Sequence, residues 1–209
     1  MKIDTVILSS NDNPDYIQFW PIVSEAWTLM GVEPILLYTG EQKLNLKGNV
    51  INFYSKNIDS SFVAQNIRIL YPSLLDGNTC LVSDIDNLPL SKKYFINSVL
   101  DYENDSFIIY RPDACPPNMI SMMWNAANSS TWKEIFNIDS ERNIEKYLKK
   151  WYTKKYAIEG KAWYTDQIKL RKYVNKFSKK NKSRIVELDD TEMGFFRFNR
   201  NKLKKHINL

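Results

Sequence analysis

Short apolar runs alternate with helical periodicity in the first half of the chain. Four runs have the length and composition of strands, at residues 3–8, 33–39, 49–54 and 79–82. Apolar residues recur at helical spacing in two stretches, residues 16–30 and 62–70. Strands that alternate with helices form right-handed crossovers and a mostly parallel sheet with both faces covered. The pattern predicts an α/β fold with a central, mostly parallel mixed sheet flanked by helices.

The second half is less regular. Further strands are expected at residues 106–110, 120–125, 184–188 and 194–198, and helices at residues 131–136, 142–156 and 166–177. No linker rich in proline, glycine and serine divides the 209 residues, a length that suits one domain. We therefore expect a single domain over residues 1–209.

Cysteine usage and hydropathy indicate which cellular compartment the protein occupies. Cys80 and Cys115 do not have metal-ligand spacing, and Cys80 falls in a predicted buried strand, which favours free thiols and a reducing compartment. Asp4 interrupts the first apolar run and no cleavage-like site follows, so this run is not expected to be a signal peptide. No run approaches the roughly 18 apolar residues of a membrane span. These features predict a soluble, cytoplasmic protein without stable membrane insertion.

Charge is unevenly distributed along the sequence. Residues 1–140 contain 9 lysines and arginines against 16 acidic residues, whereas residues 141–209 contain 20 against 8. A basic C-terminal part can attract nucleic acid, an anionic membrane or a phosphorylated substrate. Most of these lysines fall opposite the aromatic positions of predicted helices, which favours solvated helix faces.

Two carboxylates follow the buried strand at residues 79–82. Asp84 and Asp86 are separated by one residue and Pro89 then turns the chain away. Paired anions at such a place are costly unless a positive charge meets them. Oxygen ligands suit Mg²⁺ or Mn²⁺, which often complete their shell with substrate phosphates, and ligands of parallel sheets bind at the carboxyl ends of strands. The alternative is that both carboxylates only cap a helix or bond a loop.

Other nucleotide and hydrolase schemes fit poorly. The six glycines form neither a Walker-type loop nor a Gly-x-Gly-x-x-Gly motif. A serine-histidine triad has only His206 to draw on, and no Gly-x-Ser-x-Gly elbow occurs. The first strand ends in Ser9, Ser10 and Asn11, so the nucleophilic aspartate of a phosphoaspartate-type phosphatase is missing there. Metal and side chains are therefore expected to bind any phosphates.

Four segments, in order, are TVILSSND, QNIRILYPSLL, LVSDIDNLPL and WYTDQIKL, which together span residues 5–170. In these segments the sequence resembles GT-A-fold glycosyltransferases with an Asp-x-Asp motif, and is similar to the small viral domains of chlorella-virus type. The resemblance implies a GT-A (Rossmann-like) fold. It also implies a nucleotide-binding part at residues 1–105, an acceptor and sugar part at residues 106–209, and, for a viral protein, a location in the host cytoplasm.

The resemblance further implies a nucleotide-sugar donor, most often a UDP-sugar, a saccharide acceptor, and Mn²⁺ or Mg²⁺ as cofactor. Asp86 would bind the metal directly, and Asp84 would reach the donor ribose or the metal through water. The residues expected to line the base and ribose follow the first two strands and are Ser9, Ser10, Asn11, Tyr38 and Thr39.

Three further residues match positions that approach the donor in this family. Arg68 would contact the donor phosphates or sugar and assist catalysis; its alternative is a surface charge on an amphipathic helix. Asp166 and Gln167 match an Asp-Gln pair near the donor sugar. Asp166 would act as general base in an inverting enzyme and would hold the sugar in a retaining one. Its alternative is a helix N-cap.

The remaining expectations concern the second half of the chain. Asn125 would touch the donor sugar or the acceptor, and Trp163 would either stack on a sugar face or pack in the core. His206, the single histidine, would supply a third metal ligand. Without it, Arg197 or Arg200 would help neutralise the leaving diphosphate.

The sequence therefore predicts a metal-dependent glycosyltransferase that moves a hexose from a nucleotide sugar to a saccharide hydroxyl, with no nucleic-acid partner and with further domains allowed in a longer polypeptide. One alternative is a metal-dependent nucleotidyltransferase or nucleotide-sugar hydrolase. Another is a basic protein that binds nucleic acid or a membrane surface, in which Asp84 and Asp86 are structural.

Overall fold

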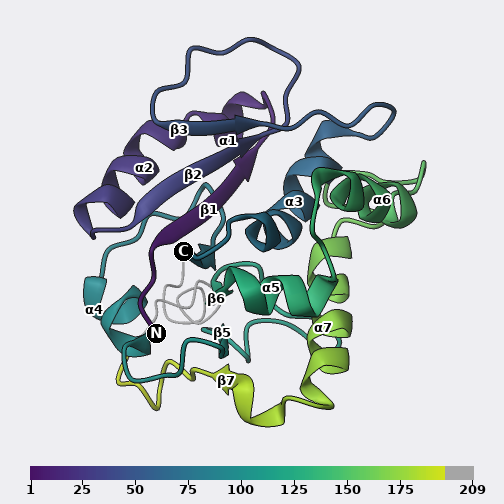
Figure 1. Ribbon diagram of the computed structural model, residues 1–209. Coiled ribbons are helices and arrows are strands. Elements are labelled where there is room, and N and C mark those ends of the chain that lie inside the picture. Colours follow the sequence, from purple (N-terminus) through teal and green to yellow (C-terminus); the bar gives the residue numbers. More distant parts are fainter. Residues whose placement is uncertain (196–209) are drawn as a thin grey trace, which may run out of the picture.

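The computed structural model describes residues 1–195, which contain a seven-stranded sheet. Its strands are β1 (Thr5–Ser10), β2 (Glu33–Tyr38), β3 (Asn49–Asn52), β4 (Thr79–Val82), β5 (Phe107–Ile109), β6 (Asn125–Asn128) and β7 (Ile185–Glu187). They lie in the order β3-β2-β1-β4-β6-β5-β7 (Figure 1). Only β6 runs against the others, since it is antiparallel to both β4 and β5 while the remaining pairs are parallel. The predicted α/β fold with a mostly parallel mixed sheet is confirmed.

Helices cover both faces of this sheet. They are α1 (Pro14–Ile17), α2 (Trp20–Leu29), α3 (Ser60–Leu70), α4 (Lys92–Phe95), α5 (Ser129–Phe136), α6 (Glu141–Trp151) and α7 (Thr165–Ser178). α3, α5, α6 and α7 share one hydrophobic core with one face of the sheet. α2 and α4 share a second core with the other face, and the two groups lie on opposite sides in Figure 1.

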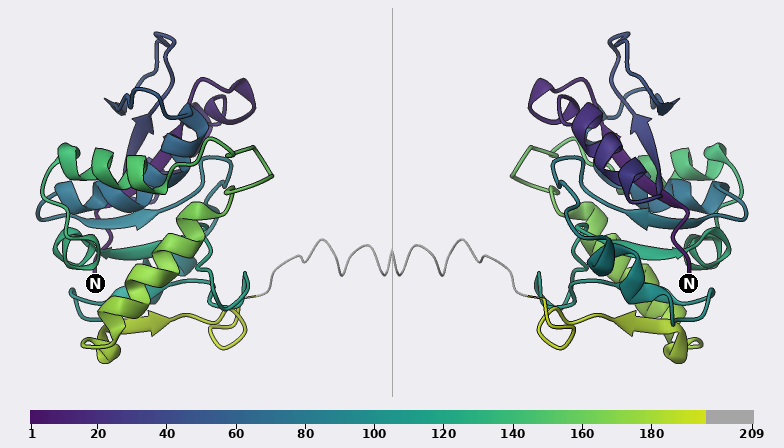
Figure 2. Two further views of the ribbon diagram at one scale, coloured as in Figure 1. Left: turned by 90° about the vertical axis from the view of Figure 1, so that its right-hand side faces the viewer. Right: turned by 90° about the vertical axis from the view of Figure 1, so that its left-hand side faces the viewer.

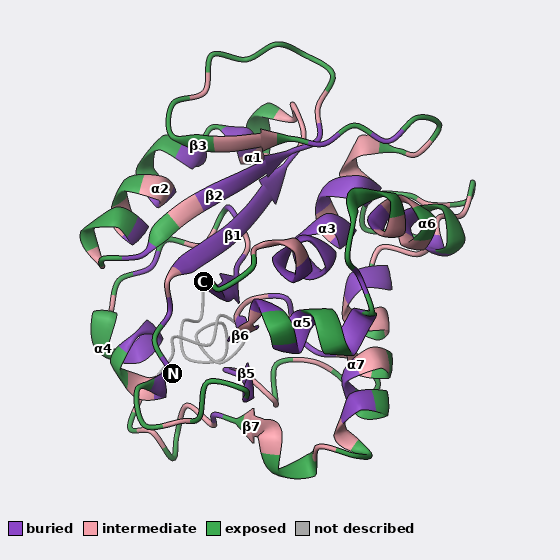
Figure 3. Ribbon diagram, in the orientation of Figure 1, coloured by how far each residue is buried: buried purple, intermediate pink, exposed green. Residues whose placement is uncertain are grey.

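Strand β1 shows why both faces need a cover. All six of its residues are buried (Figure 3). Successive side chains of a strand point to opposite faces, so Ile7 packs in the core that contains α3, whereas Val6 and Leu8 pack in the core that contains Trp20 and Trp27. The strand has no solvated face, and its polar residues are at its two ends, Thr5 at the start and Ser9 and Ser10 at the carboxyl end.

Local signals set the start of two helices. Asp59 caps α3, because its carboxylate accepts hydrogen bonds from Ser61 N at 2.8 Å and Phe62 N at 3.4 Å. Pro21 lies in the first turn of α2, where its missing N–H has no helical partner to lose. The stretch at residues 16–30 is therefore divided into α1 and α2.

The strand predicted at residues 120–125 is wrong, because β6 begins at Asn125, where that prediction ends. Ile120 and Met122 are buried, but the segment forms a turn in which Ser121 Oγ accepts a hydrogen bond from Met123 N at 3.2 Å. Two of the four residues of the strand are alanines, Ala126 and Ala127, which fit between β4 and β5. Tertiary packing has overridden β-propensity here.

The helix predicted at residues 142–156 ends early, at Trp151. Tyr152 is extended, and Tyr152 and Tyr156 pack edge-on against Phe62 of α3, with ring centroids 5.2 and 5.3 Å away. These contacts hold residues 152–164 as a loop between α6 and α7, although its lysines and two alanines favour a helix.

Three smaller expectations complete the fold. The strand predicted at residues 194–198 falls mostly outside the described residues. Cys80 and Cys115 are free thiols, as predicted. Within residues 1–195, no helix combines the length and the apolar character that crossing a bilayer requires.

Candidate functional site

A cleft of about 280 Å³ opens at the carboxyl ends of β1 and β4. Its first wall comes from residues 9–16, from α3 and from residues 84–86, which follow β4. Its second wall comes from the turn at residues 121–123 and from residues 158–167, which include the first turn of α7. The cleft therefore joins segments from both halves of the chain at the edge where parallel sheets bind ligands.

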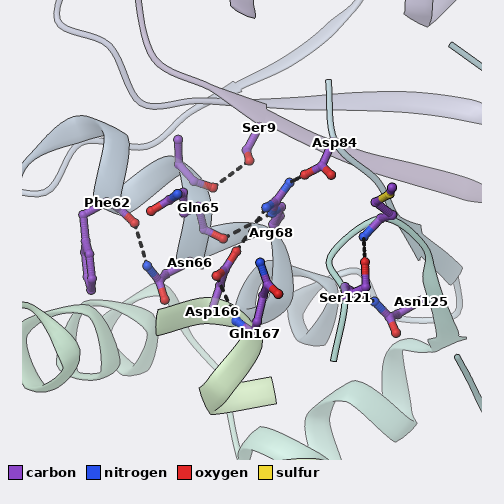
Figure 4. Close-up of polar contacts among 12 residues, drawn as sticks. Ser9, Phe62, Gln65, Asn66, Arg68, Asp84, Ser121, Asn125, Asp166 and Gln167 are labelled. Atoms are coloured by element: carbon purple, nitrogen blue, oxygen red, sulfur yellow. Dashed lines mark hydrogen bonds and ion pairs between the residues drawn. The ribbon is translucent and has the colours of Figure 1, made fainter. Parts of the chain in front are cut away.

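Arg68 lines this cleft and lies between Asp84 and Asp166 (Figure 4). Its guanidinium donates to Asp84 Oδ1, and its Nη2 lies 3.1 Å from Asp166 Oδ2. Its Nε donates to the backbone oxygen of Gln65 at 3.2 Å. One arginine on α3 thus connects the loop after β4 with the first turn of α7, and its planar fork fixes both carboxylates.

Charge and burial have opposite effects on the pKa of the Arg68 guanidinium. Burial alone would lower the pKa of its guanidinium, but the charges of Asp84 and Asp166 and the hydrogen bonds to both raise that pKa above its ordinary value. Burial raises the pKa of the Asp166 carboxyl, and the charge of Arg68 opposes this only in part. Asp166 is 2% exposed, and its Oδ1 accepts from Gln167 N at 2.8 Å, so both of its oxygens are engaged.

The two carboxylates after β4 differ in their surroundings. Asp84 also accepts a hydrogen bond from Asn87 Nδ2 at 3.3 Å. Asp86 is exposed on the cleft side, and partial desolvation and then the charge of Asp84 raise the pKa of its carboxyl. A divalent cation between the two would offset this repulsion, and their oxygens are the hard ligands that Mg²⁺ and Mn²⁺ prefer. Among residues 1–195, no group of three or more His, Cys, Asp or Glu side chains could hold a metal. Within this part of the chain, Asp84 and Asp86 would therefore hold the cation together with substrate or water.

Residues predicted after the first strand also line the cleft. Ser9 Oγ donates to the backbone oxygen of Ala64 at 2.6 Å, which fixes the end of β1 against α3. Asn11 Nδ2 donates to the hydroxyls of Ser60 and Ser61, both at 3.1 Å. Ser10 lies between them and donates to the oxygen of Asn11 at 2.9 Å.

Three of the predicted donor-binding residues do not line the cleft. Tyr38 donates to the oxygen of Gln42 at 2.9 Å, and Thr39 donates to the oxygen of Ser60 at 2.9 Å. Asn125 is fully buried at the start of β6, where its Nδ2 donates to the oxygen of Ser121 at 2.7 Å. Its Oδ1 is buried without a hydrogen-bond partner among the described residues.

His206, Arg197 and Arg200 lie outside the described residues. Gln167 and Trp163, in contrast, line the cleft beside Asp166. The structure therefore brings together nine of the candidate residues: Ser9, Ser10, Asn11, Arg68, Asp84, Asp86, Trp163, Asp166 and Gln167.

Sequence reasoning missed several lining residues. Tyr16 begins the stretch of helical periodicity at residues 16–30 and was not predicted to be a site residue, yet it lines the cleft, and burial and then the charge of Asp86 raise the pKa of its hydroxyl. Gln65 lies three residues before Arg68 on α3 and also lines the cleft. That helical spacing, which puts two side chains on one face, could have identified Gln65 from the sequence.

Comparison with solved structures finds proteins with a similar arrangement of helices and strands. The sequence matches no protein-family model and no curated protein. The structure of an active-site mutant of LgtC matches 96% of this chain and 81% of its own chain, at a TM-score of 0.50 and 10% identity. A galactosyltransferase LgtC complex with donor and acceptor sugar analogues matches 89% of this chain and 73% of its own, at a TM-score of 0.48 and 14% identity.

This chain has a GT-A-type fold. Because the LgtC active-site mutant is only 10% identical to this chain, the likeness between the two shows a shared arrangement of helices and strands and nothing more. In this GT-A-type fold the carboxyl ends of β1 and β4 carry the cleft, with Asp84 and Asp86 directly behind β4. The fold predicted from the sequence is thus confirmed, and the roles of the cleft residues rest on their own geometry.

Proposed function

We propose that this protein is a metal-dependent glycosyltransferase that moves a hexose from a nucleotide sugar, with a UDP-sugar as the first candidate, to a saccharide hydroxyl. One observation carries the proposal: Asp84 and Asp86 share a cleft with the Arg68–Asp166 ion pair, at the carboxyl ends of parallel strands. The likeness to LgtC, which is a galactosyltransferase, supports it at the level of the fold.

The first wall of the cleft suits a nucleoside diphosphate. Ser10, Asn11 and Asn13 provide hydroxyl and amide groups for a base and ribose, and the ring of Tyr16 provides a flat surface beside them. Asp84 and Asp86 would hold Mg²⁺ or Mn²⁺. When bound, the cation would neutralise the charge that develops on the departing diphosphate.

Arg68 and Asp166 would act on the sugar side. Arg68 keeps its positive charge in the buried pair and adds to the positive potential that the diphosphate needs. Both carboxylate oxygens of Asp166 accept hydrogen bonds in the structure. This favours a role in which Asp166 holds Arg68 and a sugar hydroxyl in place. A role as general base would require Arg68 to release Oδ2 when substrates bind.

Ligand-induced stabilisation tests the proposed function. A nucleotide sugar at 100 times its Kd should stabilise the protein by about 2.7 kcal/mol, which raises Tm by roughly 5–10 °C at this size. We expect the rise with a UDP-sugar plus Mn²⁺ and its loss with excess chelator. Transfer itself is then measured as nucleoside diphosphate released together with glycosylated acceptor. An equal rise in chelator, or hydrolysis that no acceptor changes into transfer, would contradict the proposal.

Trp163 is expected to bind the acceptor. Its ring lines the cleft and is stacked on Tyr156 at 6.2 Å with an interplanar angle of 22°, and Tyr156 is fixed because its hydroxyl donates to Gln65 Oε1 at 3.0 Å. Trp163→Ala should raise the acceptor KM about 3- to 10-fold and leave the Kd of the nucleoside diphosphate unchanged.

A matched control for this substitution is Tyr54→Ala, which removes an aromatic ring that is 61% exposed outside the cleft. It should change neither constant. A Trp163→Ala variant with weaker nucleoside diphosphate binding and an unchanged acceptor KM would assign the ring to the base instead.

A further inference from the structure

One side of the protein is strongly basic. Between residues 141 and 182, twelve lysine and arginine side chains are exposed, against two acidic ones, Glu141 and Glu159. They belong to α6, to the loop at residues 152–164, to α7 and to residues 179–182, which follow α7. Both helices lie on the right-hand side of Figure 1, and the left view of Figure 2 looks onto that side. We call this surface the α6–α7 face.

The cations of the two helices reinforce one another. Burial and then the charges of Lys172 and Lys150 lower the pKa of Lys169, whose Nζ lies 5.8 Å from the centroid of the Trp151 ring. The end of α6 and the start of α7 therefore present their charges together. Glu145 neutralises only Lys149, with an N–O distance of 3.0 Å.

The loop adds cations that are available to a partner. Lys154, Lys155 and Lys161 are exposed, and none of them forms an ion pair with another residue in the part of the chain that the structure describes. A concentration of unpaired positive charge on one side attracts polyanions.

Large apolar side chains are exposed among these lysines. Ile158 is 57% exposed, Tyr164 49% and Ile168 41%, and all three lie on the loop or at the start of α7. The phosphate groups of a nucleic acid make no favourable contact with an isoleucine side chain. The interface between headgroups and acyl chains of a bilayer, in contrast, accommodates aliphatic and aromatic side chains flanked by lysines. The mixture of charge and apolar surface therefore favours a lipid surface over a nucleic acid.

We propose that the α6–α7 face, centred on the loop at residues 152–164, docks on the surface of a membrane that contains anionic phospholipid. Such docking is peripheral and does not depend on the proposed transferase activity. Ile158 and Trp163 line the cleft from this same loop. A membrane bound to the loop therefore lies beside the mouth of the cleft.

Vesicle co-sedimentation tests the docking. The full chain should bind vesicles of phosphatidylcholine that contain roughly 30% phosphatidylglycerol, and should bind pure phosphatidylcholine vesicles at least about tenfold more weakly. Binding should fall steeply as NaCl is raised to about 0.5 M, because screening shortens the reach of the lysines. Equal binding to both vesicles, or binding that salt leaves unchanged, would overturn the proposal even without any variant.

A charge reversal locates the surface. Lys154→Glu together with Lys155→Glu should lower the partition coefficient on the anionic vesicles by at least about tenfold. The matched control is Lys92→Glu together with Lys93→Glu, which makes the same change on exposed residues of α4, on the other side of the sheet. Equal losses in both pairs would indicate a general charge effect and would overturn the assignment to this face.

The apolar residues separate a membrane from a nucleic acid. Tyr164→Ser with Ile168→Ser should lower vesicle binding about threefold or more and leave binding to a DNA duplex unchanged. If this variant binds vesicles as the unaltered chain does, or if the duplex binds more tightly than anionic vesicles at the same salt concentration, the face is a nucleic-acid site and the membrane proposal is wrong.

Discussion

Asp86→Asn is expected to lower sugar transfer by about 1,000-fold or more. The substitution keeps the size of the side chain but removes the charge that would hold the metal, and the leaving diphosphate then loses its main stabilising partner. Asp86 is exposed and forms no side-chain ion pair among the described residues, so the fold should tolerate the change. The measurement is kcat/KM with a UDP-sugar at saturating Mn²⁺.

The same variant also reports on binding. It should lose the Mn²⁺-dependent rise in Tm caused by a nucleotide sugar while its own Tm without ligand stays within a few degrees. Asp101→Asn is a suitable control, because Asp101 is an exposed acid away from the cleft. Retention of metal-dependent turnover in Asp86→Asn would remove the basis for placing the metal at this loop.

Arg68→Met is expected to lower the free energy of unfolding by about 3–5 kcal/mol. The Arg68 side chain is 10% exposed and contacts two carboxylates, of which that of Asp166 is 2% exposed. Methionine fills similar volume but leaves both anions without their partner. Urea unfolding monitored by circular dichroism measures the loss, and Arg142→Met, on the exposed side of α6, should change stability by less than about 0.5 kcal/mol.

A second substitution tests the cause of this loss. Arg68→Met combined with Asp166→Asn removes the buried anion as well as the cation, so the double variant should be more stable than Arg68→Met alone by about 1 kcal/mol or more. If the losses of unfolding free energy in the two single variants simply add in the double variant, then packing around Arg68, and not the unpaired carboxylates, determines how much Arg68 contributes to stability.

Much of the sheet and the first part of the cleft could be predicted from the sequence. β1, β2 and β4 are apolar runs, and α3 begins at a capping aspartate, so local patterns carry enough information. The position of Asp84 and Asp86 followed from the rule that ligands bind at the carboxyl ends of parallel strands.

Contacts between distant segments could not be predicted in this way. Asp166 contacts Arg68 across 98 positions of sequence, and no spacing rule predicts such a pair. β6 also escaped detection, because Ala126 and Ala127 carry no strand signal and are selected by the narrow space between their neighbours. Tyr38 and Thr39 were predicted to line the site but do not. They lie at a strand end near the cleft, but their side chains bond to other parts of the chain.

The single antiparallel strand has an evolutionary consequence. Val82 at the end of β4 and Ile109 at the end of β5 both pair with Asn125 at the start of β6. The connection at residues 110–124 therefore leaves and re-enters the sheet at the edge that carries Asp84 and Asp86. Its exposed residues, at 113, 114 and 116–118, can diverge while every strand keeps its register, whereas Ile120 and Met122 are constrained because they are buried in the core. We expect substrate preference to respond most to Ser121 and Met123, the partly exposed residues of this segment that line the cleft.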